Sequence, residues 1–493
     1  MTTSTFTFTP PCGPVHARAD GAVVRAGGIP YATADRFAAP VPAPDRDEPF
    51  PATGPAPACP QVRSPFLASV LGDALGDLPQ DEACQRLSVT LPRDARAGEG
   101  LPVLVWIHGG SYTTGAGDAP IMDPKPLVAE QRVVVVTVTY RLGLFGYLGS
   151  GHARPANLGL LDQLQALRWV RRNIAAFGGD PDNVTAFGQS AGGDAVAHLM
   201  AVPGAEALFR RAVIQSPPLG IARGRERMNA AMAAAAEVVT AGMPAADVVA
   251  AQAEVERHAA PFGLLGAMPF GTQYGHHPLP AEEEIDAAWD RAARHIDVLI
   301  GHTTEEARLY LATVPALQRW TRVPLLGPVL RRAVVGWATR SVYSRAIRRF
   351  ARRHVRAGGT AHRYVISWAA PGNPYGAAHT VDLPLLFGDE PTWAAPDWSP
   401  APRGRTSMPP PGRCAGCGPT SPVVSPSATP AASLASCATA ASGSRPAWGL
   451  CGDAHLDEGV PGVLEAQHGA VVPGGDLVVG QPGLQGGDVL GRG

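Results

Sequence analysis

Uninterrupted apolar runs recur through the middle of the chain. LPVLVWIHGG (101–110) and VVVVTVTYR (133–141) show no polar residue at every second position. Such runs are typical of strands that are covered on both faces in a parallel sheet. Three later segments continue the pattern, namely RRAVIQSPP (210–218), HIDVLIGHTT (295–304) and HRYVISWA (362–369).

Helical patterns alternate with these strands. The segment from Asn157 to Phe177 carries apolar residues at spacings of three and four, namely Leu160, Leu161, Leu164, Leu167, Val170 and Ile174. It predicts an amphipathic helix with one core face. NVTAFGQSAGGDAVAHLM (183–200) predicts a strand, a tight glycine turn and a helix. The alternation predicts an α/β fold, a mostly parallel central sheet flanked by helices.

Two other stretches have a different character. Residues from about Leu219 to Arg294 are rich in alanine and charged residues without a strand pattern, so we expect a helical cap inserted over the sheet. From Asp397 to Gly493 there is no Phe, Tyr or Lys, and small residues and proline dominate. We therefore expect one domain over residues 1–397 and a disordered, low-complexity tail over 398–493.

Composition narrows the classes of partner. The chain of 493 residues has 41 basic and 42 acidic side chains, a formal net charge of -1, so bulk charge favours neither nucleic acid nor an anionic membrane. The N-terminus lacks the basic and apolar regions of a signal peptide, and no apolar run approaches the roughly 18 residues of a membrane span. We expect a cytoplasmic protein.

The cysteines do not form an obvious framework. There are 7, an odd and sparse set, and four of them lie in the tail. Cys414-x-x-Cys417 with Cys437, Cys451 and His455 could be imagined as a zinc site, but a single CxxC without a regular second pair is weak evidence. We expect neither a disulfide scaffold nor a metal site.

A candidate nucleophile lies between a predicted strand and a predicted helix. Gly188-Gln189-Ser190-Ala191-Gly192 has the Gly-x-Ser-x-Gly pattern of a nucleophile elbow, in which Gly188 and Gly192 let strand and helix approach closely. The plain alternative is a glycine-rich turn whose serine caps the helix. A serine hydroxyl needs a base and a third group that orients the base, so a histidine and a carboxylate should follow downstream.

A second loop upstream offers donors for a developing oxyanion. His108-Gly109-Gly110-Ser111 follows a predicted strand and presents closely spaced backbone N–H groups. Alone, His-Gly-Gly at a strand end is more often an ordinary turn. Beside the elbow, the catalytic interpretation is favoured.

These segments together resemble the type B carboxylesterase family, the cholinesterase-like and para-nitrobenzyl esterase-like branch of the α/β-hydrolases. The resemblance runs from Gly28 to Gly388 and rests on GGIPYATADRF, VWIHGG, YRLGLFGYL, NLGLLDQLQALRWVRRNIAAFGGDPDNVTAFGQSAGG and FRRAVIQS. It implies the α/β-hydrolase fold.

The resemblance also implies a catalytic triad. Ser190 matches the nucleophile, the glutamate of LIGHTTEEARLYL that matches the acid is Glu306, and His379 in GAAHTVDLPLLFG matches the base. This order along the chain is that of the α/β-hydrolases. Without the family, Glu305 and Glu306 would be exposed residues opening a helix, and His379 a loop residue.

Further positions follow from the same resemblance. The oxyanion donors would be the backbone N–H groups of Gly110, Ser111 and Ala191. Ser111 stands where the family usually has Gly or Ala, and Gln189 replaces the common glutamate, which removes one charge near the site. Ser216 matches a serine that hydrogen-bonds near the acid and the base.

Other histidines and cysteines receive structural interpretations. We expect His108, His198 and His302 to be structural. Cys59 and Cys84 fall where many family members form their first disulfide, but we predict no bridge for a reducing cytoplasm.

The predicted function is hydrolysis of neutral or apolar small carboxylic esters through an acyl-enzyme, with no cofactor and no nucleic-acid partner. Aromatic residues at 6% argue against choline esters, and the oligomeric state stays open. Two alternatives remain. One is a catalytically silent binding protein of the cholinesterase-like type. The other is an inactive product of a frameshift near residue 397, where the helices that the family places next are missing.

Overall fold

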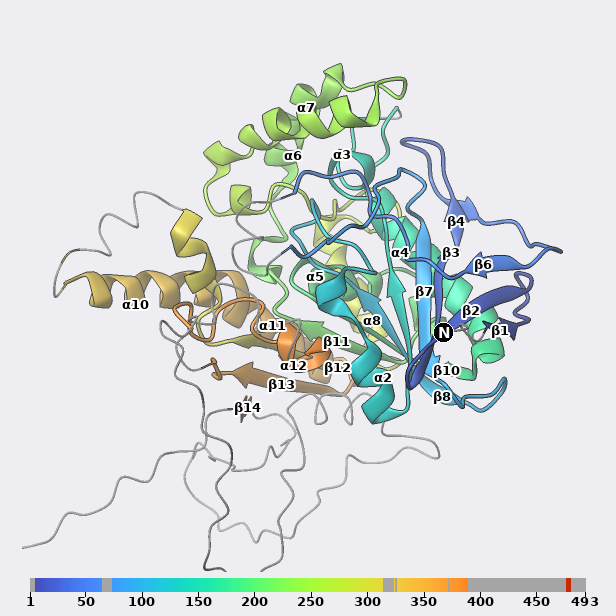
Figure 1. Ribbon diagram of the computed structural model, residues 1–493. Helices are drawn as coiled ribbons and strands as arrows, with labels where there is room; N and C mark the ends of the chain where they lie inside the picture. Colours follow the sequence, from blue (N-terminus) through green and yellow to red (C-terminus); the bar gives the residue numbers. More distant parts are fainter. Residues whose placement is uncertain are drawn as a thin grey trace, which may run out of the picture.

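The computed structural model describes residues 5–63, 73–151, 153–313, 323, 326–370, 373–388 and 476–479. Within them, a sheet of 12 strands has the order β1-β2-β3-β7-β9-β8-β10-β11-β12-β13-β14, with β6 paired to β2 (Figure 1). Its strands are β1 (Thr5–Phe8), β2 (Val15–Asp20), β3 (Val23–Pro30), β6 (Phe50–Ala52), β7 (Arg86–Pro92), β8 (Leu101–Ile107), β9 (Val134–Val138), β10 (Gly179–Gln189), β11 (Arg211–Gln215), β12 (Asp297–Thr303), β13 (Ala361–Ile366) and β14 (Asp476–Val479). A separate pair joins β4 (Ala32–Thr33) to β5 (Val41–Pro42).

The sheet is parallel where the apolar runs predicted it. All neighbouring strands from β9 through β8, β10, β11, β12 and β13 to β14 pair in parallel. Along the order β1-β2-β3-β7-β9 each strand pairs with the next antiparallel, whereas β6 pairs with β2 in parallel. The apolar runs did not predict β1, β2, β3, β6 or β7. The mostly parallel sheet flanked by helices is confirmed.

Two apolar layers explain why the central strands show no polar period. Along β8, Val103, Val105 and Ile107 point into the larger core, whereas Leu104 and Trp106 point into the core on the opposite face. Both faces of a central parallel strand are therefore covered, and every position along it is best filled by an apolar side chain.

Helices cover both faces and one end of this sheet. The α-helices are α2 (Lys125–Gln131), α3 (Gly143–Gly146), α4 (Leu158–Asn173), α5 (Ala191–Leu199), α6 (Glu226–Ala235), α7 (Ala245–Arg257), α8 (Ile285–Ala292), α10 (Leu326–Thr339), α11 (Arg345–Arg356) and α12 (Leu383–Phe387). The shorter helical turns are η1 (Pro120–Met122), η2 (Ile174–Phe177), η3 (Ala205–Ala207), η4 (Leu219–Ile221), η5 (Ala236–Val238), η6 (Ala260–Phe262), η7 (Leu265–Ala267), η8 (Glu282–Glu284), η9 (Glu306–Thr313) and the π-helical η10 (Arg340–Ser344).

The helix predicted over 157–177 forms as α4 followed by η2, but its burial differs from the prediction. Polar positions such as Asp162 and Gln163 are buried along with the apolar stripe. The reason is that Asp162 forms an ion pair with buried Arg141, and Gln163 donates to the hydroxyl of Tyr147 at 3.0 Å. Polar partners, rather than water, satisfy the second side of this helix.

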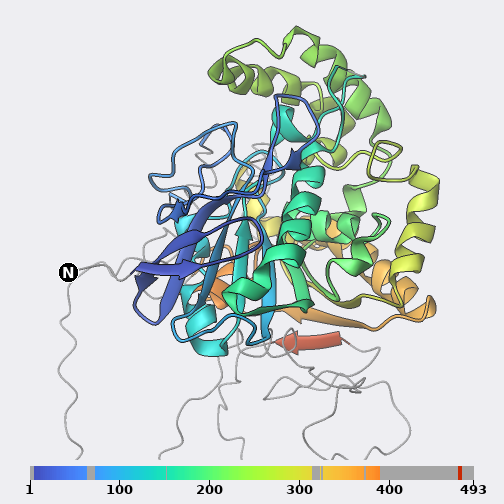
Figure 2. The same ribbon diagram turned by 90° about the vertical axis from the view of Figure 1, so that its right-hand side faces the viewer.

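The segment expected to form a cap is helical from η4 to α8. In Figures 1 and 2, α6 and α7, drawn in green, lie together at one end of the molecule. In the expected tail, Asp476–Val479 forms β14 and pairs with β13, so these four residues depart from the predicted disorder. The other residues of the 398–493 segment, including Cys414, lie outside the described residues.

Two further observations concern the described part of the chain. It contains no helix long and apolar enough to cross a membrane. Cys59 and Cys84 are buried free thiols without a disulfide.

Candidate active site

Ser190 occupies a strained turn between β10 and α5. Its φ of 60° and ψ of -125° lie in a region that residues with a side chain rarely adopt. The turn is held by a hydrogen bond from the Ser190 N–H to the carbonyl of Gln215 at 2.8 Å and by one from the Asp194 N–H to the carbonyl of Ser190 at 2.9 Å. A Cβ on Gly192 would stand 2.0 Å from the carbonyl oxygen of Ile107, so only glycine allows α5 to start this close to β8. This is the geometry of a nucleophile elbow.

The loop after β8 lies directly against this turn. A Cβ on Gly109 would stand 2.5 Å from the carbonyl oxygen of Gln189 and 3.2 Å from the Cβ of Ser190. Gly110 and Ser111 follow with positive φ values of 110° and 56°. Within the described residues, the N–H groups of Gly110, Ser111 and Ala191 donate no hydrogen bond. These are the three donors that the sequence predicted for an oxyanion, and the structure leaves all three available on neighbouring segments.

His108 anchors that loop rather than taking part in chemistry. Its ring stacks on Tyr140 with centroids 4.3 Å apart, its Nδ1 lies 2.9 Å from the carbonyl oxygen of Gly109, and the Tyr140 hydroxyl donates to its carbonyl at 2.6 Å. Burial lowers the pKa of His108 to about 4, which keeps the ring neutral. The structural interpretation of His108 agrees with this environment.

Glu306 and His379 meet as the sequence predicted. Glu306, at the start of η9, is buried, and its Oε2 lies 2.5 Å from Nδ1 of His379. Its Oε1 accepts from the hydroxyl of Ser216 at 2.6 Å and from the Thr303 N–H at 2.7 Å. Burial alone would raise the pKa of Glu306, but the charge and hydrogen bond of His379, together with the other two donors, hold it below its usual range. The carboxylate is therefore ionised and fixes the Nδ1 side of the ring.

Glu305 does not share this site. It forms an ion pair with Arg308 at 2.8 Å, and its side chain is 37% exposed. The choice between the two adjacent glutamates therefore falls to Glu306.

The other side of the His379 ring faces the elbow. The rings of Tyr310 and Tyr343 flank His379, with centroids 5.7 Å and 5.6 Å from it. The Nε2 atom lies 3.4 Å from Nε2 of Gln189, the residue before the nucleophile. Ser190 makes no side-chain hydrogen bond within the described residues. In enzymes without bound substrate, such catalytic hydrogen bonds are often long or unformed.

A second buried acid, Asp382, was missed by the sequence reasoning. It is fully buried three positions after His379, and its Oδ2 accepts a hydrogen bond from Gln215 at 3.3 Å. Burial raises the pKa of Asp382 to about 7, and the nearby charge of Glu306 contributes in the same direction. Its place in the motif AAHTVDLP was visible in the sequence, but its burial was not.

One cavity of about 630 Å³ joins the candidate groups. Ser190, His379, Gly110 and Ser111 line it, as do Leu75, Met122, Leu309 and Leu383 on apolar stretches of wall and Val249, Gln252 and Glu256 of α7. The cap helix α7 thus forms one wall of the cavity. The volume is that of an ordinary small-molecule site.

The remaining histidines near the site, candidate metal ligands by residue type, have other partners. Among the described residues, no group of three or more His, Cys, Asp or Glu side chains is placed to hold a metal ion. His198 binds Asp194 and Tyr274 through hydrogen bonds, and Nδ1 of His302 lies 2.8 Å from the Thr303 carbonyl oxygen. Both histidines have structural partners.

Comparison with known proteins decides the family. A family profile described as "Carboxylesterase family" matches residues 16–321. The chain belongs to the carboxylesterase family. A probable N-octanoylanthranilate hydrolase of Rhodococcus erythropolis is 40% identical over 397 residues, which are 78% of this chain and 86% of that protein. The para-nitrobenzyl esterase of Bacillus subtilis is 35% identical over 418 residues, covering 76% and 82% of the two chains.

Solved structures agree with this assignment. A thermophilic para-nitrobenzyl esterase superposes with a TM-score of 0.66 at 32% identity, covering 79% of this chain and 85% of that one. A carboxylesterase of Geobacillus stearothermophilus gives 0.61 at 28% identity, covering 77% and 83%. The α/β-hydrolase fold is confirmed, and the protein is a carboxylesterase.

Proposed function

We propose that this carboxylesterase acts through a serine acyl-enzyme. Ser190 Oγ attacks the carbonyl carbon of the ester, and His379 Nε2 takes the hydroxyl proton and returns it to the leaving alcohol. Water then attacks the acyl-serine with the same histidine as base, which releases the acid and restores Ser190. The observation that carries the proposal is the strained elbow of Ser190 beside a His379 ring fixed by buried Glu306.

The remaining groups have positioning or electrostatic roles in this proposal. The N–H groups of Gly110, Ser111 and Ala191 would hold the oxyanion of the tetrahedral intermediate. Ser216 positions Glu306, because its hydroxyl is one of two donors to Oε1. Glu306 in turn orients His379 and stabilises its imidazolium form.

We further propose that the substrates are neutral or apolar small esters. Support comes from the apolar stretches of the cavity wall and from the replacement of a glutamate by Gln189 next to the nucleophile. N-acylated anthranilates form a second candidate substrate class, because the relative of 40% identity is named as a probable N-octanoylanthranilate hydrolase. N-octanoylanthranilate is an amide, so its leaving group is an arylamine rather than an alcohol. Hydrolysis of N-octanoylanthranilate by the wild type that Ser190→Ala abolishes would support this second class, and no detectable hydrolysis of it would leave only the esters.

Steady-state hydrolysis of para-nitrophenyl acetate and butyrate tests the mechanism. We expect Ser190→Ala and His379→Ala to lose at least about 1,000-fold in kcat, as triad removal does elsewhere. His258→Ala, a change of an exposed histidine directly after α7, is the matched control and should retain wild-type rates. A folded wild type without turnover would favour the silent binding protein.

We also propose that residues 1–397 form the catalytic unit and that residues 398–493 are a low-complexity tail, apart from β14, which joins the sheet. Sequencing the gene tests the frameshift alternative. That alternative requires a second reading frame that encodes an amphipathic helix over the tail, and without such a frame it fails.

A further inference from the structure

The charge of this protein is strongly segregated along the chain. Between Glu306 and Asp382 the sequence contains no aspartate or glutamate, yet it contains thirteen arginines. The net charge of -1 is therefore the sum of a strongly positive charge on this segment and a negative net charge on the rest of the chain. Of the eleven arginines of this segment that the structure describes, nine lie in a single helical run.

This run comprises α10, the π-helical turn η10 and α11, without a break from Leu326 to Arg356. One side of it packs on the protein through the buried side chains of Val335, Tyr343, Ile347 and Phe350. The first half of α10 buries almost nothing, and α10 projects from the body of the molecule in Figure 1.

Large apolar side chains line the outer side of α10. Leu326, Val329, Leu330 and Trp337 are 69%, 65%, 37% and 59% exposed, and their helical spacing places them in one stripe. Arg331 and Arg332, on either side of this stripe, are also exposed. A stripe of this kind with flanking cations is typical of helices that lie in a membrane interface.

Arginines occupy the corresponding positions of α11. Arg345, Arg348, Arg349, Arg352 and Arg356 are exposed and line one groove of about 350 Å³. Four of them, Arg345, Arg348, Arg349 and Arg356, repeat the spacing of the apolar stripe on α10 nineteen residues further on. Because a π turn takes up one residue more than an α turn, these nineteen residues correspond to about eighteen α-helical residues, or five full turns. The apolar and the arginine stripes therefore lie on the same side of the run, and we call them together the α10–α11 stripe.

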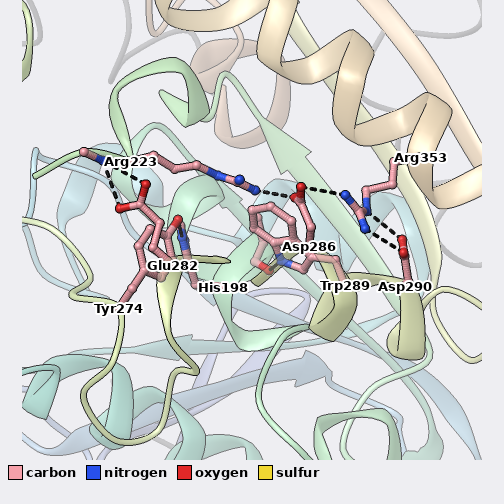
Figure 3. Close-up of polar contacts among 10 residues, drawn as sticks. His198, Arg223, Tyr274, Glu282, Asp286, Trp289, Asp290 and Arg353 are labelled. Atoms are coloured by element: carbon pink, nitrogen blue, oxygen red, sulfur yellow. Dashed lines mark hydrogen bonds and ion pairs between the residues drawn. The ribbon is translucent and has the colours of Figure 1, made fainter. Parts of the chain in front are cut away.

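One arginine of α11 lies on the inner side and holds the run in place. Arg353 contacts Asp290 of α8 at 2.6 Å and Asp286 at 2.6 Å, and Asp286 also pairs with Arg223 (Figure 3). These ion pairs fix α11 on α8. Of the exposed arginines, Arg349 also borders this anchor, because it lines a small pocket with Asp286 and Arg353.

We propose that the α10–α11 stripe docks this carboxylesterase onto the surface of an anionic lipid membrane. The arginines match lipid phosphates and anionic headgroups, and Leu326, Val329 and Trp337 enter the boundary between headgroups and acyl chains. A nucleic acid would match the charge but gives the apolar stripe no partner. If a second copy of the chain packed against the same stripe, the arginines of the two copies would lie close together and repel each other. In this proposal the run from Leu326 to Arg356 lies along the membrane surface and does not span the membrane. The described part of the chain contains no helix that could span it.

Co-sedimentation of the full chain with vesicles tests the proposal. We expect binding to vesicles of phosphatidylglycerol and phosphatidylcholine, little binding to pure phosphatidylcholine, and weakening as salt rises. Arg352→Gln with Arg356→Gln, both exposed and lining the groove of α11, should lower the partition constant by roughly five-fold per arginine, about 25-fold in all. Arg171→Gln with Arg172→Gln, exposed arginines of α4, is the matched control and should change little.

The apolar part is tested separately. Leu326→Ser with Trp337→Ser should reduce binding, whereas Val41→Ser with Val238→Ser, also exposed, should not. Circular dichroism and thermal unfolding check that each variant folds. The proposal is overturned if the wild type ignores anionic vesicles, or if both stripe variants bind as it does. It is also overturned if sedimentation shows a dimer that binds no vesicles and that Leu326→Ser with Trp337→Ser dissociates.

Discussion

Replacing Asp382 by asparagine should change how the stability of this protein depends on pH. Asp382 is fully buried near Glu306 and His379, and burial raises its pKa from 3.8 to about 7. The folded state therefore holds the Asp382 proton more tightly than the unfolded state does. The stability that this proton gives is fully present below pH 3.8 and is lost as pH rises to about 7.

The size of the effect follows from this shift. Each pKa unit corresponds to about 1.36 kcal/mol, so a shift of roughly 3 units makes ionised Asp382 cost about 4 kcal/mol above pH 7. Between pH 5 and pH 8, the wild type should lose roughly 2.7 kcal/mol of unfolding free energy through Asp382 alone. Asp382→Asn keeps the shape and cannot ionise, so it should lack this loss.

Urea unfolding of both proteins at pH 5 and pH 8 measures the difference. We subtract the unfolding free energy of the wild type from that of Asp382→Asn at each pH. This difference should be larger at pH 8 than at pH 5 by about 2 to 3 kcal/mol, because only the wild type loses stability as pH rises. Asp47→Asn, an exposed aspartate in a loop, serves as control and should give the same difference at both pH values. An equal difference for Asp382→Asn at pH 5 and pH 8 would refute the reasoning.

Three changes near the nucleophile should alter catalysis. Ser216→Ala removes the hydroxyl that donates to Glu306 at 2.6 Å, and it should lower kcat/KM for para-nitrophenyl butyrate by roughly ten-fold. The acid limb of the pH profile of kcat/KM should also move to higher pH, and an unchanged profile would exclude the positioning role of Ser216. Gln189→Glu places a carboxylate where the Gln189 amide nitrogen lies 3.4 Å from Nε2 of His379, and this negative charge favours the imidazolium form. The fall of kcat/KM on the acid side should therefore move to higher pH by about one unit, and a shift to lower pH would contradict this. Gly109→Ala forces a Cβ to within 2.5 Å of the Gln189 carbonyl oxygen and should lower kcat by about 100-fold. Gly54→Ala, with nothing within 4 Å, should not, and equal rates in the two alanine variants would disprove the steric argument.

The sequence predicted the central sheet because β-strands covered on both faces leave an uninterrupted apolar run. The run 101–107 forms β8, and its alternate residues enter two different cores. The N-terminal strands β1 and β2 were not predicted, since their half-exposed residues give short mixed patterns. The burial of α4 also differed, because the partners of Asp162 and Gln163 come from other parts of the chain.

The candidate site shows the same division. Ser190, Glu306 and His379 stand in motifs, so their positions could be predicted, and the structure brings Glu306 and His379 into contact. Asp382 was missed because its importance comes from burial. The expectation from net charge was also incomplete, since an average of -1 conceals the arginine-rich run of α10 and α11.

Covalent labelling of the nucleophile tests the central claim most directly. A fluorophosphonate ester reacts with an activated serine by losing fluoride and forming a phosphonyl-serine. Peptide mass spectrometry should find one adduct, on Ser190, in the wild type. Ser190→Ala should give no adduct, and His379→Ala should react far more slowly. An unlabelled, folded wild type, or an adduct on another residue such as Ser216, would contradict the account.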